Sequence, residues 1–387
     1  MQRKVHLRPP KEANANGKIW LLEKCVYGLV DASLKWYEKV RKTLKECGGT
    51  ESKVDPAVFY WHDSNGLAGV LAVHVDDFLW AGSEIFEINV ISKVKEVFNV
   101  GKEASESFKY LGLGLNQCDD KIILSQKDYV NVLKTVSVDR KRMKDSQLTP
   151  AEQTILRSKV GQLLWLARQT RPDIAFDIAI IASKLKTSTV EDLKRANKLL
   201  RKVKNDTVSL QFKDLGEHVE LMLFSDASFG NLPDGGSQGG FVMLLLGENG
   251  NVNPVTWQSK KIRRVVRNTL SSEALALADG IDCASSVATL YNELISNKST
   301  PEGGTCIPIK CVIDNKDLYE ALHSTKNVSE RRLRLEISYI KEMIQKGDLT
   351  VHWVETNEQI ANVLTKHGAC AQKLLECLKT GHVETMF

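Results

Sequence analysis

Three acidic residues in the second half of the chain have the types and positions that divalent-cation chemistry needs. Asp226 ends an apolar, strand-like run in LMLFSDASFG, and Asp314 ends another in KCVIDNKDL. Glu273 falls in the first turn of a predicted helix, in NTLSSEALAL. Acids at strand ends and helix starts are placed to meet at one edge of a sheet. Carboxylates that close together stay ionised only with hard divalent ions such as Mg²⁺ or Mn²⁺ bound through oxygen.

Such a cluster fits two-metal phosphodiester hydrolysis, in which one ion lowers the pKa of the attacking water and the other stabilises the leaving oxygen. A single Asp at a strand end is more often a turn former or a helix cap. Ser271 or Ser272 can cap the predicted helix without any catalytic neighbour. The three acids together, in this order of elements, favour a site.

The elements that must position these acids form a mixed pattern of strands and helices from Glu217 onward. Three strands, a long helix and then alternating strands and helices are typical of an α/β (α+β) domain with a mixed sheet. The predicted strands are 219–225, 239–246, 253–258, 308–313 and 349–354, and the predicted helices are 271–296, 316–323, 328–346 and 357–366.

Before this domain, two short apolar runs flank Asp76 and Asp77 in GVLAVHVDDFLWAG, which predicts a tight β-hairpin with acids at its turn. The other predicted elements are helices at 30–47 and 85–98, strands at 108–116 and 121–125, and a mainly helical stretch at 126–215. Together these patterns predict three domains, 1–125, 126–215 and 216–387, with the last boundary near 210–218.

Composition bounds the class of protein. The 387 residues contain no apolar run long enough to cross a bilayer, and the first 18 residues have no signal-peptide pattern. The eight cysteines form no CxxC pair and are predicted to be small core residues in a reducing compartment. We therefore expect a cytoplasmic or nuclear protein without a membrane partner.

The net charge of +5 is mild, but its distribution is uneven. The segment KKIRRVVR concentrates cations that could bind a phosphate backbone, although most charge runs are solvated surface. The candidate nucleic-acid-binding residues are Lys260, Lys261, Arg263, Arg264 and Arg267.

The segments FSDASFG, GGFVMLL, VTWQSKK, LSSEALALADG, VIDNKDL and VHWVETNEQIANVLTK resemble, in order and spacing, the ribonuclease H of copia-type LTR retrotransposon Pol polyproteins. The resemblance implies the ribonuclease H fold and cleavage of the RNA strand of an RNA–DNA hybrid with two Mg²⁺ ions. It implies that Asp226, Glu273 and Asp314 are three of the four metal-binding acids. The fourth position, an Asp in the family's IADxLTK motif, is Asn362 here, which adds no charge and predicts weakened metal binding.

The first half resembles the reverse transcriptase of the same elements, in the segments KCVYGLVDASLKWYEKV, HVDDFLWAG and SKVGQLLWLARQTRPDIAFDIAIIASKL. The resemblance implies that Asp76 and Asp77 are the paired polymerase aspartates. The family places a further metal-binding Asp just before a segment like VHLRPPKEA, which here is 5–13. We therefore expect a truncated palm and thumb with an exposed apolar surface, no DNA synthesis by this chain alone, and an upstream polymerase fragment as a possible partner.

The favoured hypothesis is a retrotransposon-derived, metal-dependent ribonuclease H that binds an RNA–DNA hybrid through its backbone and shape. The alternative is a catalytically inactive remnant, or a recruited copy that only binds nucleic acid. A different nuclease of the same fold is disfavoured by the polymerase-like segments.

Overall fold

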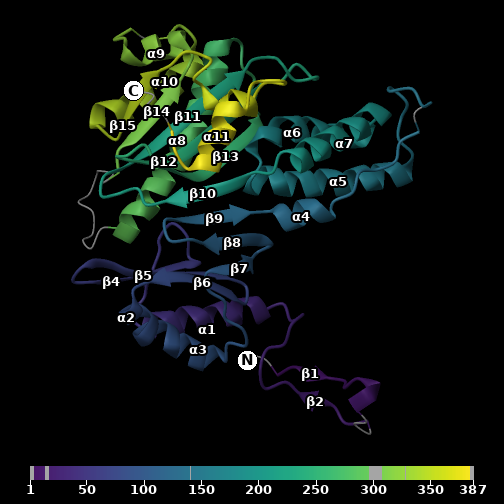
Figure 1. The fold of residues 1–387 in the computed structure, drawn as a ribbon, viewed down its shortest axis with the longest axis vertical. Helices are drawn as coiled ribbons and strands as arrows, with labels where there is room; N and C mark the ends of the chain where they lie inside the picture. Colours follow the sequence, from purple (N-terminus) through teal and green to yellow (C-terminus); the bar gives the residue numbers. More distant parts are fainter. Residues whose placement is uncertain (1–3, 14–16, 140, 296–306, 327, 384–387) are drawn as a thin grey trace. The chain divides into compact units, whose positions relative to one another are not determined.

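The computed structural model describes residues 4–13, 17–139, 141–295, 307–326 and 328–383. It divides into two compact units, which Figure 1 shows as ribbons. The first unit is Met1–Glu103 with Glu293–Ser299, and the second is Ala104–Asn292 with Thr300–Phe387.

The first unit contains an antiparallel sheet in the order β3-β4-β5-β6. Apolar side chains from strands and helices form its core, including Phe59, Leu71, Val40, Leu44 and Phe86. Its elements are β1 (His6–Leu7), the 3₁₀ turn η1 (Lys11–Ala13), β2 (Trp20–Leu21), α1 (Ala32–Glu46), β3 (Thr50–Glu51), β4 (Val58–Asp63), β5 (Gly66–His74), β6 (Asp77–Gly82), α2 (Glu84–Phe86), the π-helix η2 (Glu87–Ile91) and α3 (Ser92–Phe98). The predicted hairpin and both predicted helices are present.

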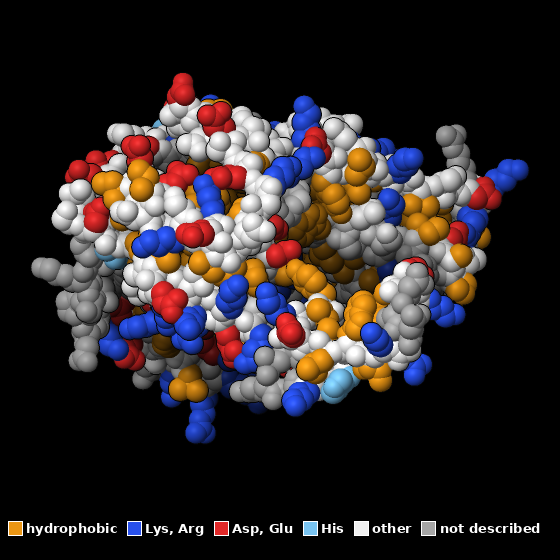
Figure 2. Space-filling view, turned by 90° about the horizontal axis from the view of Figure 1, so that it is seen from below, with side chains coloured by type: hydrophobic (Ala, Val, Ile, Leu, Met, Phe, Trp, Pro, Cys, Tyr) orange, Lys and Arg blue, Asp and Glu red, His pale blue; other side chains and the backbone are white. Residues whose placement is uncertain are grey.

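Several large apolar side chains of this unit are exposed. Figure 2 shows hydrophobic side chains gathered between charged ones on the face that it draws. The exposed residues before α1 and at its start are Leu7, Ile19, Trp20, Leu21, Val26, Tyr27, Val30 and Leu34.

The second unit begins with a four-stranded antiparallel sheet in the order β10-β9-β8-β7. The strands are β7 (Ser107–Tyr110), β8 (Leu113–Gln117), β9 (Lys121–Ser125) and β10 (Ser209–Lys213). The single strand expected at 108–116 is wrong, because Leu111 (φ 49°) and Gly112 (φ 79°) form a left-handed turn that splits it into a hairpin. β10 is a strand within the stretch expected to be mainly helical. β10 pairs antiparallel with β9, and both strands belong to the second compact unit.

Helices fill most of the chain between β9 and β10. Their apolar faces form one core, and a capping box of Thr149 and Glu152 starts the longest of them. The Arg171 guanidinium is buried against Asp173, which satisfies both charges. The helices are α4 (Lys127–Val132), α5 (Pro150–Gln169), η3 (Pro172–Ile174), α6 (Ala175–Ser183), η4 (Leu185–Thr187) and α7 (Val190–Asn205).

A five-stranded mixed sheet in the order β13-β12-β11-β14-β15 forms the rest of the second unit. β11 pairs antiparallel with β12 and parallel with β14, which confirms the predicted mixed sheet and the α/β class. The strands are β11 (Val219–Ser228), β12 (Gln238–Gly247), β13 (Val252–Lys261), β14 (Ile309–Ile313) and β15 (Leu349–Trp353).

Side chains alternate between the two faces of this sheet, and each face has its own core. Helices α8 (Thr269–Ile295), α9 (Lys316–His323) and α10 (Arg331–Lys346) contribute to one core. The other core contains the 3₁₀ turn η5 (Ile360–Leu364), helix α11 (Gln372–Thr380) and residues of β10. The helix expected at 357–366 is therefore wrong, because this segment forms only the short η5.

None of the helices that the structure describes is long and apolar enough to cross a lipid bilayer.

Candidate active site

The structure brings Asp226, Glu273 and Asp314 together. Asp226 lies on β11, Glu273 on α8, and Asp314 directly after β14, so the parallel pair β11 and β14 places both aspartates at the same edge of the sheet. One carboxylate oxygen from each acid lies within 4.8 Å of those from the other two. Among the described residues, no other group of three His, Cys, Asp or Glu side chains comes together in this way.

Asn268 starts the helix that carries Glu273. Its Oδ1 accepts hydrogen bonds from the backbone N–H of Ser271, at 2.8 Å, and from the Ser271 hydroxyl, at 2.7 Å. The expectation that Ser271 or Ser272 is the cap is therefore wrong. The Ser272 hydroxyl donates to the carbonyl of Thr269 instead.

Burial dominates the electrostatics of the acids. Asp226 is fully buried, which raises its pKa to about 6, while Lys366 and Thr365 oppose this shift. Burial also raises the pKa of Glu273 well above its ordinary value, and the neighbouring Asp226 and Asp314 carboxylates add to the effect. At neutral pH a cation at this position would replace the protons that the raised pKa values favour.

One carboxylate oxygen in the cluster lacks a partner. Glu273 is 3% exposed, and its buried Oε2 has no hydrogen bond among the residues that the structure describes. A buried, unsatisfied carboxylate oxygen is unfavourable unless a cation or proton binds it. The donor set, three carboxylates with one oxygen unpaired, therefore fits a hard divalent ion such as Mg²⁺.

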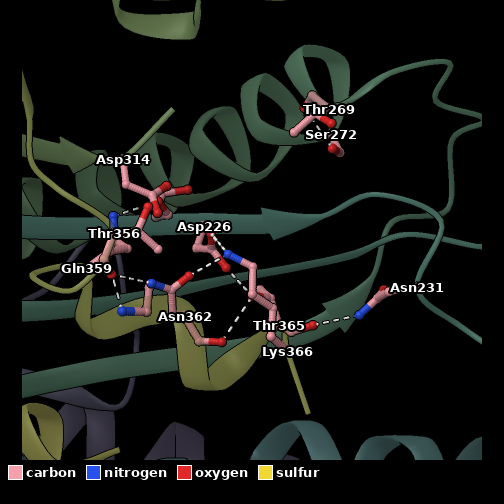
Figure 3. A network of polar contacts seen from close by, with 12 residues as sticks. Asp226, Asn231, Thr269, Ser272, Asp314, Thr356, Gln359, Asn362, Thr365 and Lys366 are labelled. Atoms are coloured by element: carbon pink, nitrogen blue, oxygen red, sulfur yellow. Dashed lines mark hydrogen bonds and ion pairs between the residues drawn. The ribbon is translucent and has the colours of Figure 1, made fainter. Parts of the chain in front are cut away.

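Lys366 is a charged member of the site that the sequence reasoning missed. Its Nζ donates to Asp226 Oδ1 at 3.0 Å and to Asn362 Oδ1 at 2.5 Å, so one ammonium joins the two residues (Figure 3). The Asn362 Nδ2 donates to the carbonyl of Thr356 at 2.7 Å. A possible signal was the lysine four residues after Asn362, because short helical turns bring such residues to one side.

The turn that carries Asn362 is fixed by buried hydrogen bonds. The Gln359 Nε2 donates to the carbonyls of Ser225, at 3.0 Å, and Val312, at 3.1 Å, which lie on β11 and β14. The Thr365 hydroxyl donates to Asp226 Oδ2. Sequence reasoning missed Gln359 and Thr365, since their partners lie far away along the chain.

The helical region before the mixed sheet also supports this turn and its neighbourhood. The Trp257 indole on β13 donates to the carbonyl of Ala167 on α5 at 2.6 Å. Directly after the turn, His367 Nδ1 lies 2.6 Å from a carboxylate oxygen of Asp177 on α6. The two regions also share the core that contains η5.

Asp76 and Asp77 lie in the first unit, at the turn between β5 and β6. Both are exposed, and Val75 before them has φ 55°, which is unusual for a β-branched residue. Among the described residues, no third acid, histidine or cysteine joins them in a metal-binding group.

The predicted basic segment lies at the end of β13 and in the loop before α8. Lys260 pairs with Asp279 at 3.0 Å, Lys261 pairs with Asp234, and Arg264 pairs with Glu336. In the part of the chain that the structure describes, the exposed Arg263 and Arg267 have no ion-pair partner. Of the five predicted basic residues, these two are therefore the ones that no described carboxylate neutralises.

Residues 1–149 match the family model described as reverse transcriptase (RNA-dependent DNA polymerase). The Retrovirus-related Pol polyprotein from transposon RE1 of Arabidopsis thaliana is 25% identical over 360 residues, which cover 89% of this chain and 24% of that protein. The putative transposon Ty5-1 protein YCL074W of Saccharomyces cerevisiae is 29% identical over 279 residues, covering 67% of this chain and 88% of that protein. The chain thus spans about a quarter of the length of the RE1 polyprotein.

Among solved structures, ribonuclease H1 of the halophilic archaeon Halobacterium salinarum is similar over 38% of this chain and 94% of its own, with 17% identity and a TM-score of 0.27. LC11-RNase H1, solved in complex with an RNA/DNA hybrid, also covers 38% of this chain and 94% of its own, with 14% identity and a TM-score of 0.29.

Proposed function

Since the chain is related over most of its length to copia-type retrotransposon Pol polyproteins, we propose that it hydrolyses the RNA strand of RNA–DNA hybrids at Asp226, Glu273 and Asp314. The observation that carries this proposal is the convergence of the three carboxylates within 4.8 Å, with Glu273 Oε2 buried and unpartnered among the described residues.

A divalent cation held by these carboxylates, Mg²⁺ or Mn²⁺, would lower the pKa of the attacking water and stabilise the leaving oxygen. The residues of the chain position this chemistry. Thr365 and Lys366 hold the two oxygens of Asp226, so that its carboxylate has one orientation. Gln359 fixes the turn that carries Asn362 against both strands of the acids. A two-cation arrangement would need a further oxygen ligand at the position of Asn362, whose Oδ1 accepts a hydrogen bond from Lys366.

We propose that the hybrid is held by its backbone, with Arg263 and Arg267 as contacts to phosphate. Lys260, Lys261 and Arg264 can contribute if they exchange their surface carboxylate partners for phosphate, which is feasible because exposed ion pairs are weak. The cysteines that the structure describes are free thiols, which suits the reducing cytoplasm or nucleus proposed for this chain.

We do not propose DNA synthesis by this chain alone. Polymerase chemistry needs more metal-binding acids than Asp76 and Asp77, and among the described residues none joins them. A polymerase fragment carrying the further acid is a proposed partner.

A second candidate function is hybrid binding without cleavage. Asn362 favours it, because its oxygen already accepts a hydrogen bond from Lys366 and carries no charge for a cation. Both candidate functions require binding of an RNA–DNA hybrid, but only the first includes cleavage of its RNA strand.

Incubation of the purified chain with an RNA–DNA hybrid, with Mg²⁺ and then Mn²⁺, separates them. We expect cation-dependent cutting of the RNA strand that is lost in Asp226→Asn. Binding of the hybrid without any cutting by the folded chain would overturn the proposal in favour of the second candidate.

A further inference from the structure

The ammonium of Lys366 lies between two oxygens that a cation could bind. Asp226 Oδ1 is 3.0 Å away and Asn362 Oδ1 is 2.5 Å away, and the Lys366 side chain is 38% exposed while Asp226 is fully buried. A half-buried ammonium that contacts a buried carboxylate is a strong, charge-assisted interaction.

The backbone around Lys366 holds the ammonium in this place. The Lys366 N–H donates to the carbonyl of Asn362 at 3.1 Å, and the neighbouring Thr365 hydroxyl donates to Asp226. The Thr365 carbonyl in turn accepts from Asn231 Nδ2 at 2.8 Å. Lys366 is therefore presented to Asp226 by a fixed turn rather than by a free side chain.

The site thus offers two places for positive charge, and they differ. The first lies among Asp226, Glu273 and Asp314, where Glu273 Oε2 is buried and has no partner among the described residues. The second lies between Asp226 and Asn362, where Lys366 already supplies the charge.

The charges of the site also favour one divalent cation over two. When ionised, three carboxylates and one ammonium leave two negative charges, which one divalent ion neutralises. A second divalent ion beside the ammonium would meet only the neutral oxygen of Asn362 and a carboxylate oxygen already in use. Like charges at such short range repel strongly in a buried site.

We infer that the site binds a single divalent cation, at Asp226, Glu273 and Asp314, and that the Lys366 ammonium takes the place of a second cation between Asp226 and Asn362. This inference rests on the site of the proposed function, but it concerns the number of ions and does not require that the hybrid is cut.

The test counts bound Mn²⁺ by electron paramagnetic resonance and isothermal titration calorimetry. The samples are the parent chain and the variants Lys366→Met, Lys366→Arg and Lys366→Met/Asn362→Asp. Each is measured free and with a hybrid whose RNA strand is 2′-O-methylated, so that it stays uncut. Lys346→Met is the matched control, because Lys346 forms an exposed ion pair with Glu342 far from the acids along the chain.

We expect one Mn²⁺ in the parent, in Lys366→Arg and in Lys346→Met. Removing the charge in Lys366→Met should tighten Mn²⁺ binding by roughly tenfold. Lys366→Met/Asn362→Asp, with a fourth acid and no ammonium, should bind two ions with the hybrid present.

Two Mn²⁺ ions in the parent would overturn the inference, and this result needs no variant to fold. Unchanged or weaker binding in a folded Lys366→Met, or one ion in the folded double variant with hybrid, would also overturn it. A single ion in a parent that does not cut RNA would leave this inference standing while the proposed function fails.

Discussion

Asp226 on β11 pairs directly across the sheet with Gly240 on β12. A Cβ atom on Gly240 would lie 2.6 Å from Leu364 Cβ and 3.1 Å from Thr365 Cγ2. The absence of a side chain at Gly240 therefore allows the turn that carries Asn362 to approach Asp226 closely.

Gly240→Ala should push this turn away from Asp226. We expect the free energy of unfolding to fall by about 1–3 kcal/mol, as for other overpacked cores, and RNA cleavage to fall by more than the loss of folded protein explains. Urea unfolding and cleavage rates of the same preparation measure the two effects. Gly161→Ala is the matched control, since its added Cβ meets nothing within 4 Å. Equal effects of the two substitutions would contradict the role of Gly240.

Gln359→Leu should destabilise the second unit. The change removes the amide that donates to the carbonyls of Ser225 and Val312 and leaves both buried carbonyls without this donor. We expect a loss of about 2–3 kcal/mol in the free energy of unfolding, measured in urea. The exposed Gln117→Leu on β8 should change it by less than about 0.5 kcal/mol. Similar stability of the two variants would rule out Gln359 as an anchor of the turn.

Glu273→Gln should stabilise the cation-free protein by about 1 kcal/mol while abolishing cleavage, because it removes a buried charge that lies beside two other acids. Thermal unfolding in EDTA measures the gain. The variant should also lose most of the rise in Tm that Mn²⁺ gives the parent. A destabilised Glu273→Gln that still responds fully to Mn²⁺ would contradict this account of the carboxylate.

The raised pKa values of Asp226 and Glu273 predict a pH-dependent response to cations. A carboxylate whose pKa is higher in the folded state binds more protons when folded, so without cations stability should fall as pH rises from about 4 through about 6. Cations compete with these protons. The increase in Tm given by Mn²⁺ should therefore be larger at pH 7.5 than at pH 5.5. An equal increase in Tm at pH 5.5 and pH 7.5 would contradict this competition between cations and protons.

Arg263→Gln and Arg267→Gln should weaken binding of an RNA–DNA hybrid and make it less dependent on salt. Both arginines are exposed and without an ion-pair partner among the described residues, so each can neutralise one phosphate. We expect the slope of log K against log[salt] to decrease in magnitude by about 1 for each substitution. Fluorescence anisotropy with an uncut, 2′-O-methylated hybrid measures it, and Lys346→Gln serves as the control. Unchanged slopes would place the hybrid elsewhere.

The acids of the site could be predicted from the sequence because each ends an apolar run or starts a helix, and these patterns are local. The contacts that shape the site could not. The hydrogen bonds of Gln359, Thr365 and Lys366 to β11 join residues 134 to 140 positions apart in the sequence. These residues come together only when the chain folds. The sequence around Gly240 likewise does not indicate that Leu364 packs against it.

The prediction of individual strands and helices failed where a turn or a distant contact, rather than the local apolar pattern, determines the structure. The left-handed turn at Leu111 and Gly112 interrupts an apolar run that resembles one strand. Strand β10 was missed because its partner β9 lies on the other side of the helical region in the sequence, so the pairing leaves no local pattern. Residues 357–366 form a 3₁₀ turn rather than a helix, since Gln359 and Thr365 tie this segment to the sheet.

The most direct test of the central claim is cleavage of a hybrid labelled separately on each strand, by the parent, Asp226→Asn and Asp314→Asn, with circular dichroism to show that all three are folded. The account predicts cation-dependent cutting of the RNA strand alone by the parent, and a loss of at least about 100-fold in both variants. Cutting that persists in both folded variants, or a folded parent that binds Mn²⁺ and hybrid but leaves the RNA intact, would contradict it.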